Sequence, residues 1–411
     1  MRRWLPTLLA ALPCIASEPG YRDIDAPPHL YRQHTPSDRF TRIKDDLESG
    51  RIALDRTSEK AFVVSLLHVL NVPASSQMLV FSTTSLQLRF ISPSNPRALF
   101  FTDDVYVGFI PGGRVEIVSL DPELGAIFSI FDIPRDTQPV RIERSERCMN
   151  CHAAADTGFV PGLLMKSVIP GPAGGSLTAY RIEQMGHGIP FDQRFGGWYV
   201  TGNPPIAGNL ANFIGRFSEG VLTKQAIEPG TRFDFARYPV ATSDVLPQLL
   251  LEHQAGFVNR VVEASYRART ALHASGGALS REQADELDAQ ARIVTRYVLF
   301  ADEVALPPDG VVGDEVFKKD FLVAQRNAAN GGALREFDLR TRLFKRRCSY
   351  MVYSVVFAGL PPPMKQRIFK RLGEALSVEK PDAEYAYLPQ DEKLAIRAVL
   401  KSTLTDLSDD W

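Results

Sequence analysis

The sequence predicts an α+β fold in which an antiparallel β-rich N-terminal region is followed by a mainly helical C-terminal half. Between residues 78 and 132, short apolar runs of period two are separated by Gly, Pro, Asn and Asp, as in strands joined by turns. From about residue 243, apolar residues recur every three or four positions instead, as on one face of a helix. The composition, 45% hydrophobic and 23% charged in 411 residues, is that of an ordinary globular protein.

The first residues have the features of a Sec-type signal peptide. Arg2 and Arg3 precede an apolar segment at residues 4–15 that ends in small residues, which is the pattern of an export signal. We expect residues 1–17 to be removed, the mature protein to be periplasmic or secreted, and residues 18–57 to form an extended arm. Lipidation of Cys14 is an alternative that the preceding Pro13 disfavours.

Residues 58–240 are expected to form a β-rich region that begins with one helix. Ser58 is a typical N-cap for the amphipathic segment 58–70. Strands are then predicted at residues 78–82, 86–90, 98–102, 105–110, 115–119 and 126–132, with a hairpin turn at Gly112 and Gly113. Further extended segments are predicted at residues 161–168, 176–182 and 198–201.

Residues 241–411 are expected to form a helical region that covers the β-rich one. Asp244 is the expected cap of a long helix that ends before Gly276. Ser280 and Gln283 form a capping-box pattern at the start of a second helix that runs to about residue 302. Shorter helices are predicted at residues 315–325, 348–357, 363–376 and 390–404.

The most informative motif is CMNCH at residues 148–152. In a C-x-x-C-H run, two thiols on one turn can add to the two vinyl groups of a single porphyrin, and the imidazole that follows can bind the iron. The motif therefore predicts one covalently attached haem c, with Cys148 and Cys151 as anchors and His152 as the proximal iron ligand. An export signal agrees with this prediction because c-type haem is attached outside the cytoplasm.

Three other uses of the two thiols have to be weighed. A dithiol redox pair usually follows a hydrophobic strand, whereas residues 141–147 before this motif are mostly charged. A zinc site needs a fourth ligand, and Cys348 is the only other thiol beyond the signal peptide. A disulfide between Cys148 and Cys151 would be strained at this spacing. Covalent haem is favoured over all three.

The sixth ligand of the iron is assigned to His187. It lies in a glycine-containing loop at residues 184–190, where the backbone can approach a flat ligand closely. A histidine in this position gives a low reduction potential and a methionine a higher one. His187 as an ordinary surface residue is the alternative, and the other candidate ligands are Met165, Met185, His253 and His273.

Arg194 and Trp198 are assigned to haem binding. Both lie in the segment 192–202, which combines glycines with large aromatic residues. An Arg fork suits a propionate carboxylate, and a Trp ring can pack on a porphyrin face. The alternative is a tight turn with a core Trp. The basic segment 340–347 is either a salt-bridged surface or a docking patch for an acidic redox partner.

Several short sequence segments together resemble those of a known family. They are residues 92–97, 103–108, 148–152, 196–202, 251–254 and 348–350, and they are similar to phrases in large secreted, mostly uncharacterised bacterial proteins of planctomycete type that carry a single cytochrome c-type CxxCH haem motif. In that family a His precedes the Gly-Gly-Trp-Tyr segment, and His187 occupies that place here. A second His that commonly follows the segment is missing, since residues 202–205 read GNPP.

The expected function is that of an exported c-type cytochrome that transfers electrons to or from a redox partner protein in the cell envelope. A peroxidase-like haem enzyme and a haem-based sensor are the alternatives, and no catalytic residue is assigned. The net charge of -1 disfavours a nucleic-acid partner, because such proteins carry a clustered basic excess. No segment reaches the roughly 18 consecutive apolar residues that a membrane span requires.

Overall fold

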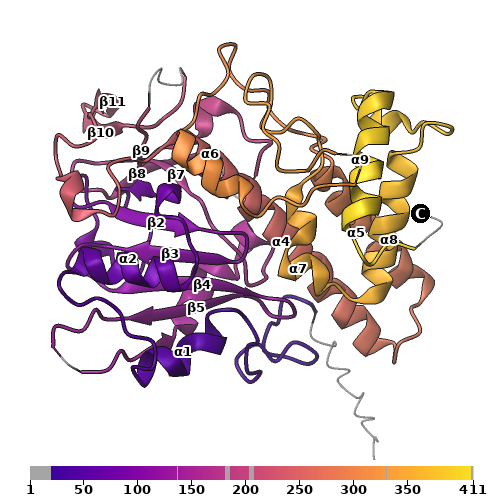
Figure 1. The fold of residues 1–411 in the computed structure, drawn as a ribbon, viewed down its shortest axis with the longest axis horizontal. Coiled ribbons are helices and arrows are strands. Elements are labelled where there is room, and N and C mark those ends of the chain that lie inside the picture. Colours follow the sequence, from indigo (N-terminus) through magenta and orange to yellow (C-terminus); the bar gives the residue numbers. More distant parts are fainter. Residues whose placement is uncertain (1–19, 137, 181–185, 203–207, 330, 409–410) are drawn as a thin grey trace, which may run out of the picture.

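The computed structural model describes residues 20–411 except positions 137, 181–185, 203–207, 330 and 409–410. The expected signal peptide, residues 1–17, lies outside the described residues. The fold class is confirmed: an antiparallel seven-stranded sheet in the N-terminal half is followed by a mainly helical C-terminal half. Figure 1 shows the sheet on one side of the molecule and the last helices on the other.

The segment predicted as an extended arm contains turns and the helix α1 (Thr41–Glu48). Asp38 accepts hydrogen bonds from the backbone N–H groups of Phe40 and Thr41 where this helix begins. Tyr31, Phe40 and Leu47 are all buried. These apolar contacts hold the segment against the rest of the protein, so it is not an extended arm.

The main sheet has the strand order β6-β5-β4-β3-β2-β1-β9. Its strands are β1 (Met78–Val80), β2 (Arg97–Phe101), β3 (Val105–Phe109), β4 (Val115–Asp121), β5 (Gly125–Phe131), β6 (Glu143–Arg144) and β9 (Trp198–Tyr199). The prediction of a strand at 86–90 was wrong, because this segment ends in a 3-10 turn, η2 (Leu88–Phe90). Leu86 and Leu88 are 46% and 55% exposed, so its apolar residues do not meet a core.

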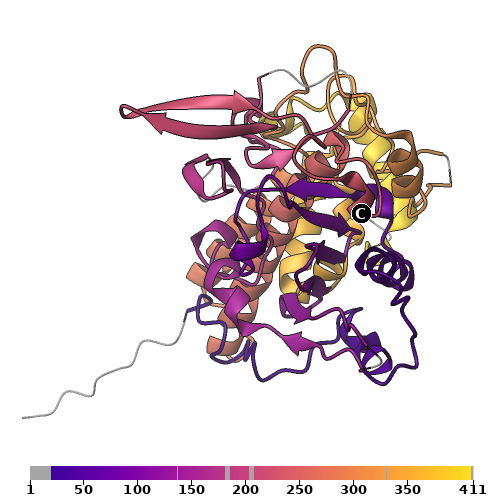
Figure 2. The same cartoon turned by 90° about the vertical axis from the view of Figure 1, so that its left-hand side faces the viewer.

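Each face of the sheet contributes to a separate hydrophobic cluster. On one face, Val107 and Ile117 pack with helix α2 (Glu59–Val69), which begins at the predicted N-cap Ser58. On the opposite face, Tyr106 and Phe128 pack with helix α4 (Val245–Ala274) and the other C-terminal helices. Covered on both sides, strands β3 and β5 are buried along their whole length and read as continuous apolar runs. Figure 2 shows these layers from the side.

The C-terminal half contains α4, α5 (Arg281–Val298), α6 (Glu315–Leu322), α7 (Val355–Ala358), α8 (Pro362–Ala375) and α9 (Gln390–Thr403). The capping box of Ser280 and Gln283 is present. The helix predicted at 348–357 is instead a 3-10 turn, η7 (Tyr350–Tyr353), followed by α7, because Ser354 caps a new helix by accepting from the Phe357 N–H. Within the described part of the chain, no helix is long and apolar enough to cross a membrane.

Two hairpins lie beside the main sheet. One joins β7 (Ser167–Pro170) to β8 (Ser176–Tyr180), so most of the extended segment expected at 161–168 is loop. The other joins β10 (Phe213–Ser218) to β11 (Val221–Ala226) and projects from the molecule in Figure 2. The sequence analysis did not predict this second hairpin, whose outer residues are exposed and carry no alternating apolar pattern.

Candidate functional site: the CxxCH segment

The two motif thiols lie on one short helical segment at the edge of the sheet. Directly after β6, the chain forms a 3-10 turn, η3 (Glu146–Cys148), that continues into helix α3 (Met149–His152). The Ser145 N–H donates to the Phe128 carbonyl at 2.8 Å, and Met149 is buried in the core. Both thiols are free, with Cys148 partly buried and Cys151 exposed. The segment is therefore fixed by its core side, with the Cys151 thiol exposed and Cys148 Sγ donating to Ser145 Oγ at 3.4 Å.

The imidazole of His152 is oriented by the backbone. Its Nδ1 lies 2.9 Å from the carbonyl oxygen of Gly162, and because a carbonyl only accepts, Nδ1 carries the proton and Nε2 keeps its lone pair. The ring packs against Phe128 with 4.4 Å between centroids. Burial lowers the pKa of His152 to about 4. A neutral imidazole with one nitrogen anchored to a carbonyl has the form that binds a metal.

The loop that supplies the Gly162 carbonyl is clamped by helix α4. The Asn259 side chain accepts from the Leu163 N–H at 2.8 Å and donates to the Leu163 carbonyl at 3.0 Å. The Gly162 N–H donates to the His152 carbonyl at 2.9 Å. A Cβ at position 162 would lie 2.3 Å from Asn259 Oδ1, so this position has no room for a side chain. Sheet, loop and α4 together fix the direction of the His152 ring.

Two partly buried apolar side chains share the sheet face of Phe128, whose ring contacts His152. Val118 is the cross-strand partner of Phe128, and Leu99 on β2 points to the same face. Both side chains are only partly buried although they pack against the larger core. Between β2 and β4, Gly108 places no side chain at this level. Apolar side chains on this face, together with two free thiols and a neutral imidazole, fit the porphyrin, thioether and iron requirements of haem c.

Trp198 lies on this same sheet face, opposite Val80 in the pairing of β9 with β1. Its side chain is buried, and its Nε1–H donates to the Lys166 carbonyl at 2.8 Å. The indole hydrogen therefore has a protein acceptor. Contact between the Trp198 ring and haem stays a prediction.

The structure places His187 in a second cluster, away from the motif's own contacts. His187 Nδ1 lies 2.8 Å from Nδ1 of His253, and His253 Nε2 lies 2.7 Å from Ser349 Oγ. The His187 ring stacks on Tyr297 and on Phe300. Among the described residues, no hydrogen bond, ion pair or ring contact joins His187 to residues 148–152. Its assignment as the sixth iron ligand stays a prediction.

Arg194 belongs to the His187 cluster. Its Nε and Nη2 donate to the backbone carbonyls of Ile189 and His187 at 2.7 and 2.9 Å. Its Nη1 lies 3.3 Å from a carboxylate oxygen of Glu252, and both side chains are buried. Arg194 therefore lies beside His187, and its guanidinium faces protein acceptors here. A propionate contact by Arg194 also stays a prediction.

The other candidate ligands are distributed over the fold. Met165 is buried, and Met185 lies outside the described residues. Cys348 is buried in the helical half. In the described ranges there is no group of three or more His, Cys, Asp or Glu side chains that could hold a metal ion.

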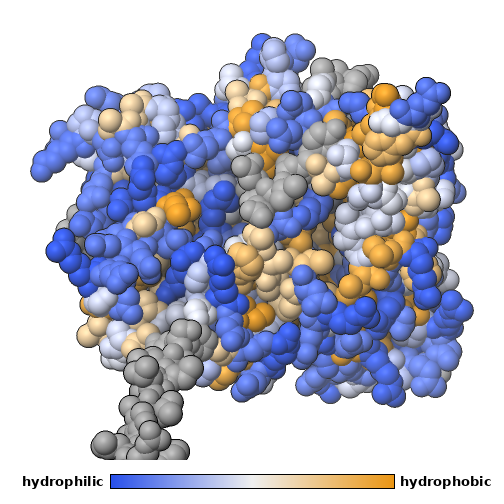
Figure 3. Space-filling view, turned by 180° about the vertical axis from the view of Figure 1, so that it is seen from behind, coloured by the Kyte–Doolittle hydropathy of each residue, from blue (hydrophilic) through white to orange (hydrophobic). Residues whose placement is uncertain are grey.

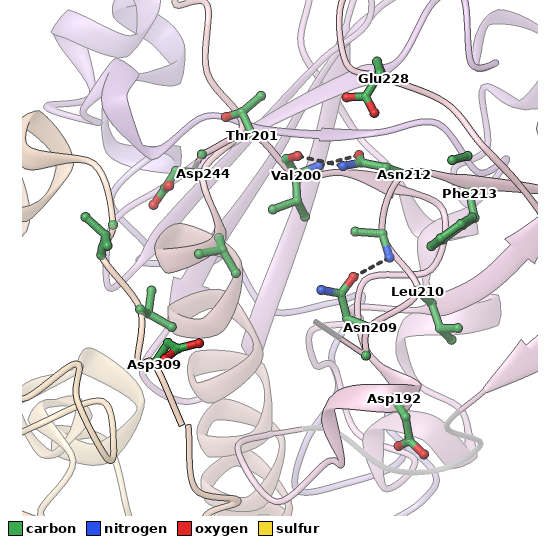
Figure 4. A pocket seen from close by; sticks show the side chains of 18 of the residues that line it. Asp192, Val200, Thr201, Asn209, Leu210, Asn212, Phe213, Glu228, Asp244 and Asp309 are labelled. Atoms are coloured by element: carbon green, nitrogen blue, oxygen red, sulfur yellow. Dashed lines mark hydrogen bonds between the residues drawn. The ribbon is translucent and has the colours of Figure 1, made fainter. Parts of the chain in front are cut away.

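A cavity of about 550 Å³ lies elsewhere, between the base of the β10–β11 hairpin, the start of α4 and the loop at 309–313. Its lining is rich in carboxylates, which come from Asp192, Glu228, Asp244 and Asp309. Figure 4 shows the Asn212 side chain at its wall, bonded to the backbone of Val200. No residue of the CxxCH motif lines this cavity.

No sequence pattern predicts the residues that orient the motif. Gly162, Asn259 and Phe128 act on His152 through a backbone carbonyl, a loop clamp and a ring contact. Gly162 lies ten positions after His152 and Asn259 more than a hundred, so no motif spacing connects them. Asn259 gave no signal either, because it lies outside the apolar stripe predicted for the helix that became α4.

No protein-family model, curated protein or solved structure matches this chain. The resemblance to secreted single-haem proteins therefore rests on short segments of the sequence alone.

Proposed function

We propose that this protein is an exported c-type cytochrome that binds one haem covalently and transfers single electrons. The observation that carries the proposal is the geometry of the motif. Free thiols at Cys148 and Cys151 share one short helical segment with His152, whose Nδ1 is fixed by the Gly162 carbonyl. When bound, haem c supplies an iron that cycles between the ferric and ferrous states.

Each residue of the site has a distinct part in this proposal. The sulfurs of Cys148 and Cys151 hold the porphyrin, and Nε2 of His152 is the proximal ligand. The hydrogen bond from Nδ1 to the Gly162 carbonyl keeps the ring in one tautomer and strengthens its donor character. Val118 and Leu99, partly buried on the Phe128 face of the sheet, would offer apolar contacts to the porphyrin.

The experiment is expression with an export signal in a host that matures c-type cytochromes, followed by denaturing gel electrophoresis and haem staining. The wild type should retain the stain after denaturation, and a Cys148→Ala/Cys151→Ala double variant should lose it. Cys348→Ser is the matched control, because this buried thiol lies outside the motif, and it should stain like the wild type. Equal staining of all three proteins would contradict the assigned attachment site.

A second measurement separates electron transfer from ligand chemistry. Absorption and resonance Raman spectra of the matured protein should show six-coordinate low-spin iron in both oxidation states, together with reversible one-electron titration. Five-coordinate or water-ligated iron would favour the haem-enzyme or sensor alternatives.

A further inference from the structure

A partly buried ion pair lies on the sheet face that carries the CxxCH segment. Arg97 on β2 and Glu116 on β4 point to the same side as Leu99 and Val118. Arg97 Nη1 lies 2.8 Å from Glu116 Oε2, and the two side chains are 15% and 21% exposed. Between them, Gly108 of β3 provides no side chain, so the pair can meet across the intervening strand.

The Glu116 carboxylate is held firmly in its ionised form. Its Oε1 accepts from Ser85 Oγ at 2.5 Å and from Gln87 Nε2 at 2.9 Å. Burial by itself would raise the pKa of Glu116, but the Arg97 charge and these hydrogen bonds lower it overall. A fixed carboxylate on one side positions the Arg97 guanidinium without consuming all of its donors.

Arg97 retains a donor that nothing in the described protein satisfies. Its Nε is buried and has no hydrogen-bond partner, although buried N–H groups are nearly always bonded. The pair lies on the sheet face next to the motif, because Glu116 is two positions from Val118 on β4, and Phe128, the cross-strand partner of Val118, packs on the His152 ring. The carboxylates of haem c are acceptors that can satisfy such a cationic donor.

We propose that the ion pair of Arg97 and Glu116 lies at the haem. Arg97, positioned by Glu116, faces a porphyrin carboxylate, and the two charges set the reduction potential of the iron. This inference rests on the proposed function. It assigns the propionate contact to Arg97 on the sheet instead of Arg194, whose donors face protein acceptors.

The opposite charges of the pair give the test a predicted sign. Reduction adds one electron from the titrating reductant to the iron, so a nearby cation favours the ferrous state and a nearby anion the ferric state. Arg97→Gln should lower the midpoint potential, and Glu116→Gln should raise it. Arg97→Lys retains the cation, so its shift should be smaller than that of Arg97→Gln.

The titrations use matured full-length protein, with haem content and circular dichroism recorded for each variant. Arg39→Gln is the matched control, since Arg39 pairs with Asp104 at 3.2 Å and binds the last turn of α2 away from the motif; its potential should equal that of the wild type. Shifts of the same sign for Arg97→Gln and Glu116→Gln, or no shift in either, would overturn this inference. Loss of covalent haem from the wild type itself would instead overturn the proposed function.

Discussion

The His152 imidazole and the Gly162 carbonyl are joined by a 2.9 Å hydrogen bond that spans a tight loop between α3 and β7. The Gly162 N–H returns a bond to the His152 carbonyl, so the two residues are linked in both directions. This reciprocal contact fixes the direction of Nε2 before any ligand is present. The site therefore combines a pre-oriented imidazole with two free thiols, of which that of Cys151 is exposed.

The first prediction concerns the clamp on this loop. Asn259→Ala removes both side-chain hydrogen bonds to Leu163. The buried N–H and carbonyl of Leu163 then lack these partners, which costs about 1–3 kcal/mol per group. Urea unfolding should show this loss of stability. Gln225→Ala on the exposed hairpin strand β11 is the control and should change the unfolding free energy by less than about 0.5 kcal/mol. Equal effects of the two substitutions would contradict the clamp.

The second prediction tests the close approach of the loop to α4. Gly162→Ala places a methyl group 2.3 Å from Asn259 Oδ1, so the loop has to move. Overpacking of this kind costs about 1–3 kcal/mol, and the displaced carbonyl should weaken the hold on His152. The same substitution at Gly175, where a Cβ meets nothing within 4 Å, should be tolerated. Thermal unfolding followed by circular dichroism would reveal whether the two variants differ.

The third prediction is a pH dependence from the buried histidine pair. Burial lowers the pKa of His253 to about 3 and that of His187 well below its usual value of 6.5. As pH falls below 6.5, these histidines bind protons in the unfolded chain but not in the folded chain. The free energy of unfolding is therefore highest above pH 6.5 and decreases toward pH 4. Each such group contributes a slope of about 1.4 kcal/mol per pH unit.

Urea unfolding of the protein without haem, at several pH values, measures this slope. His253→Phe should reduce the slope of the unfolding free energy against pH by the contribution of one histidine, whatever the effect of the substitution on stability at pH 7. Replacement of the exposed His34 by Gln should leave the slope unchanged. A slope that is the same in His253→Phe as in the wild type would rule out the buried pair as its source.

The fourth prediction separates the structural role of Arg194 from a haem role. Arg194→Gln removes the cation that faces buried Glu252, and breaking a buried pair costs about 3–5 kcal/mol. We expect a large loss of stability with an unchanged midpoint potential in the fraction that folds and carries haem. A shifted potential would restore the sequence-based assignment of Arg194 to a propionate.

Much of the fold followed from local patterns in the sequence. The strands β2 to β5 and the helices α4, α5, α8 and α9 have apolar patterns that are visible locally, and the caps of α4 and α5 at Asp244 and Ser280 were predicted directly. A strand was wrongly predicted at residues 86–90 because the alternating apolar residues Leu86 and Leu88 face solvent. No local pattern separates that arrangement from a strand with one buried face.

The site was predictable only as far as its motif. The three motif residues lie within five positions of the sequence, whereas Phe128 reaches His152 through the pairing of β5 in the sheet. Register depends on long-range pairing, which a single sequence does not encode in any spacing. The contact of His187 with His253, which in turn contacts Ser349, also required the tertiary fold, because these residues are far apart in the sequence.

The intact mass of the denatured, purified mature protein tests the central claim most directly. The account predicts the polypeptide mass plus one haem, retained through acid-acetone extraction and absent from the Cys148→Ala/Cys151→Ala variant. A polypeptide mass with no addition, from a host that loads a control cytochrome in parallel, would contradict it.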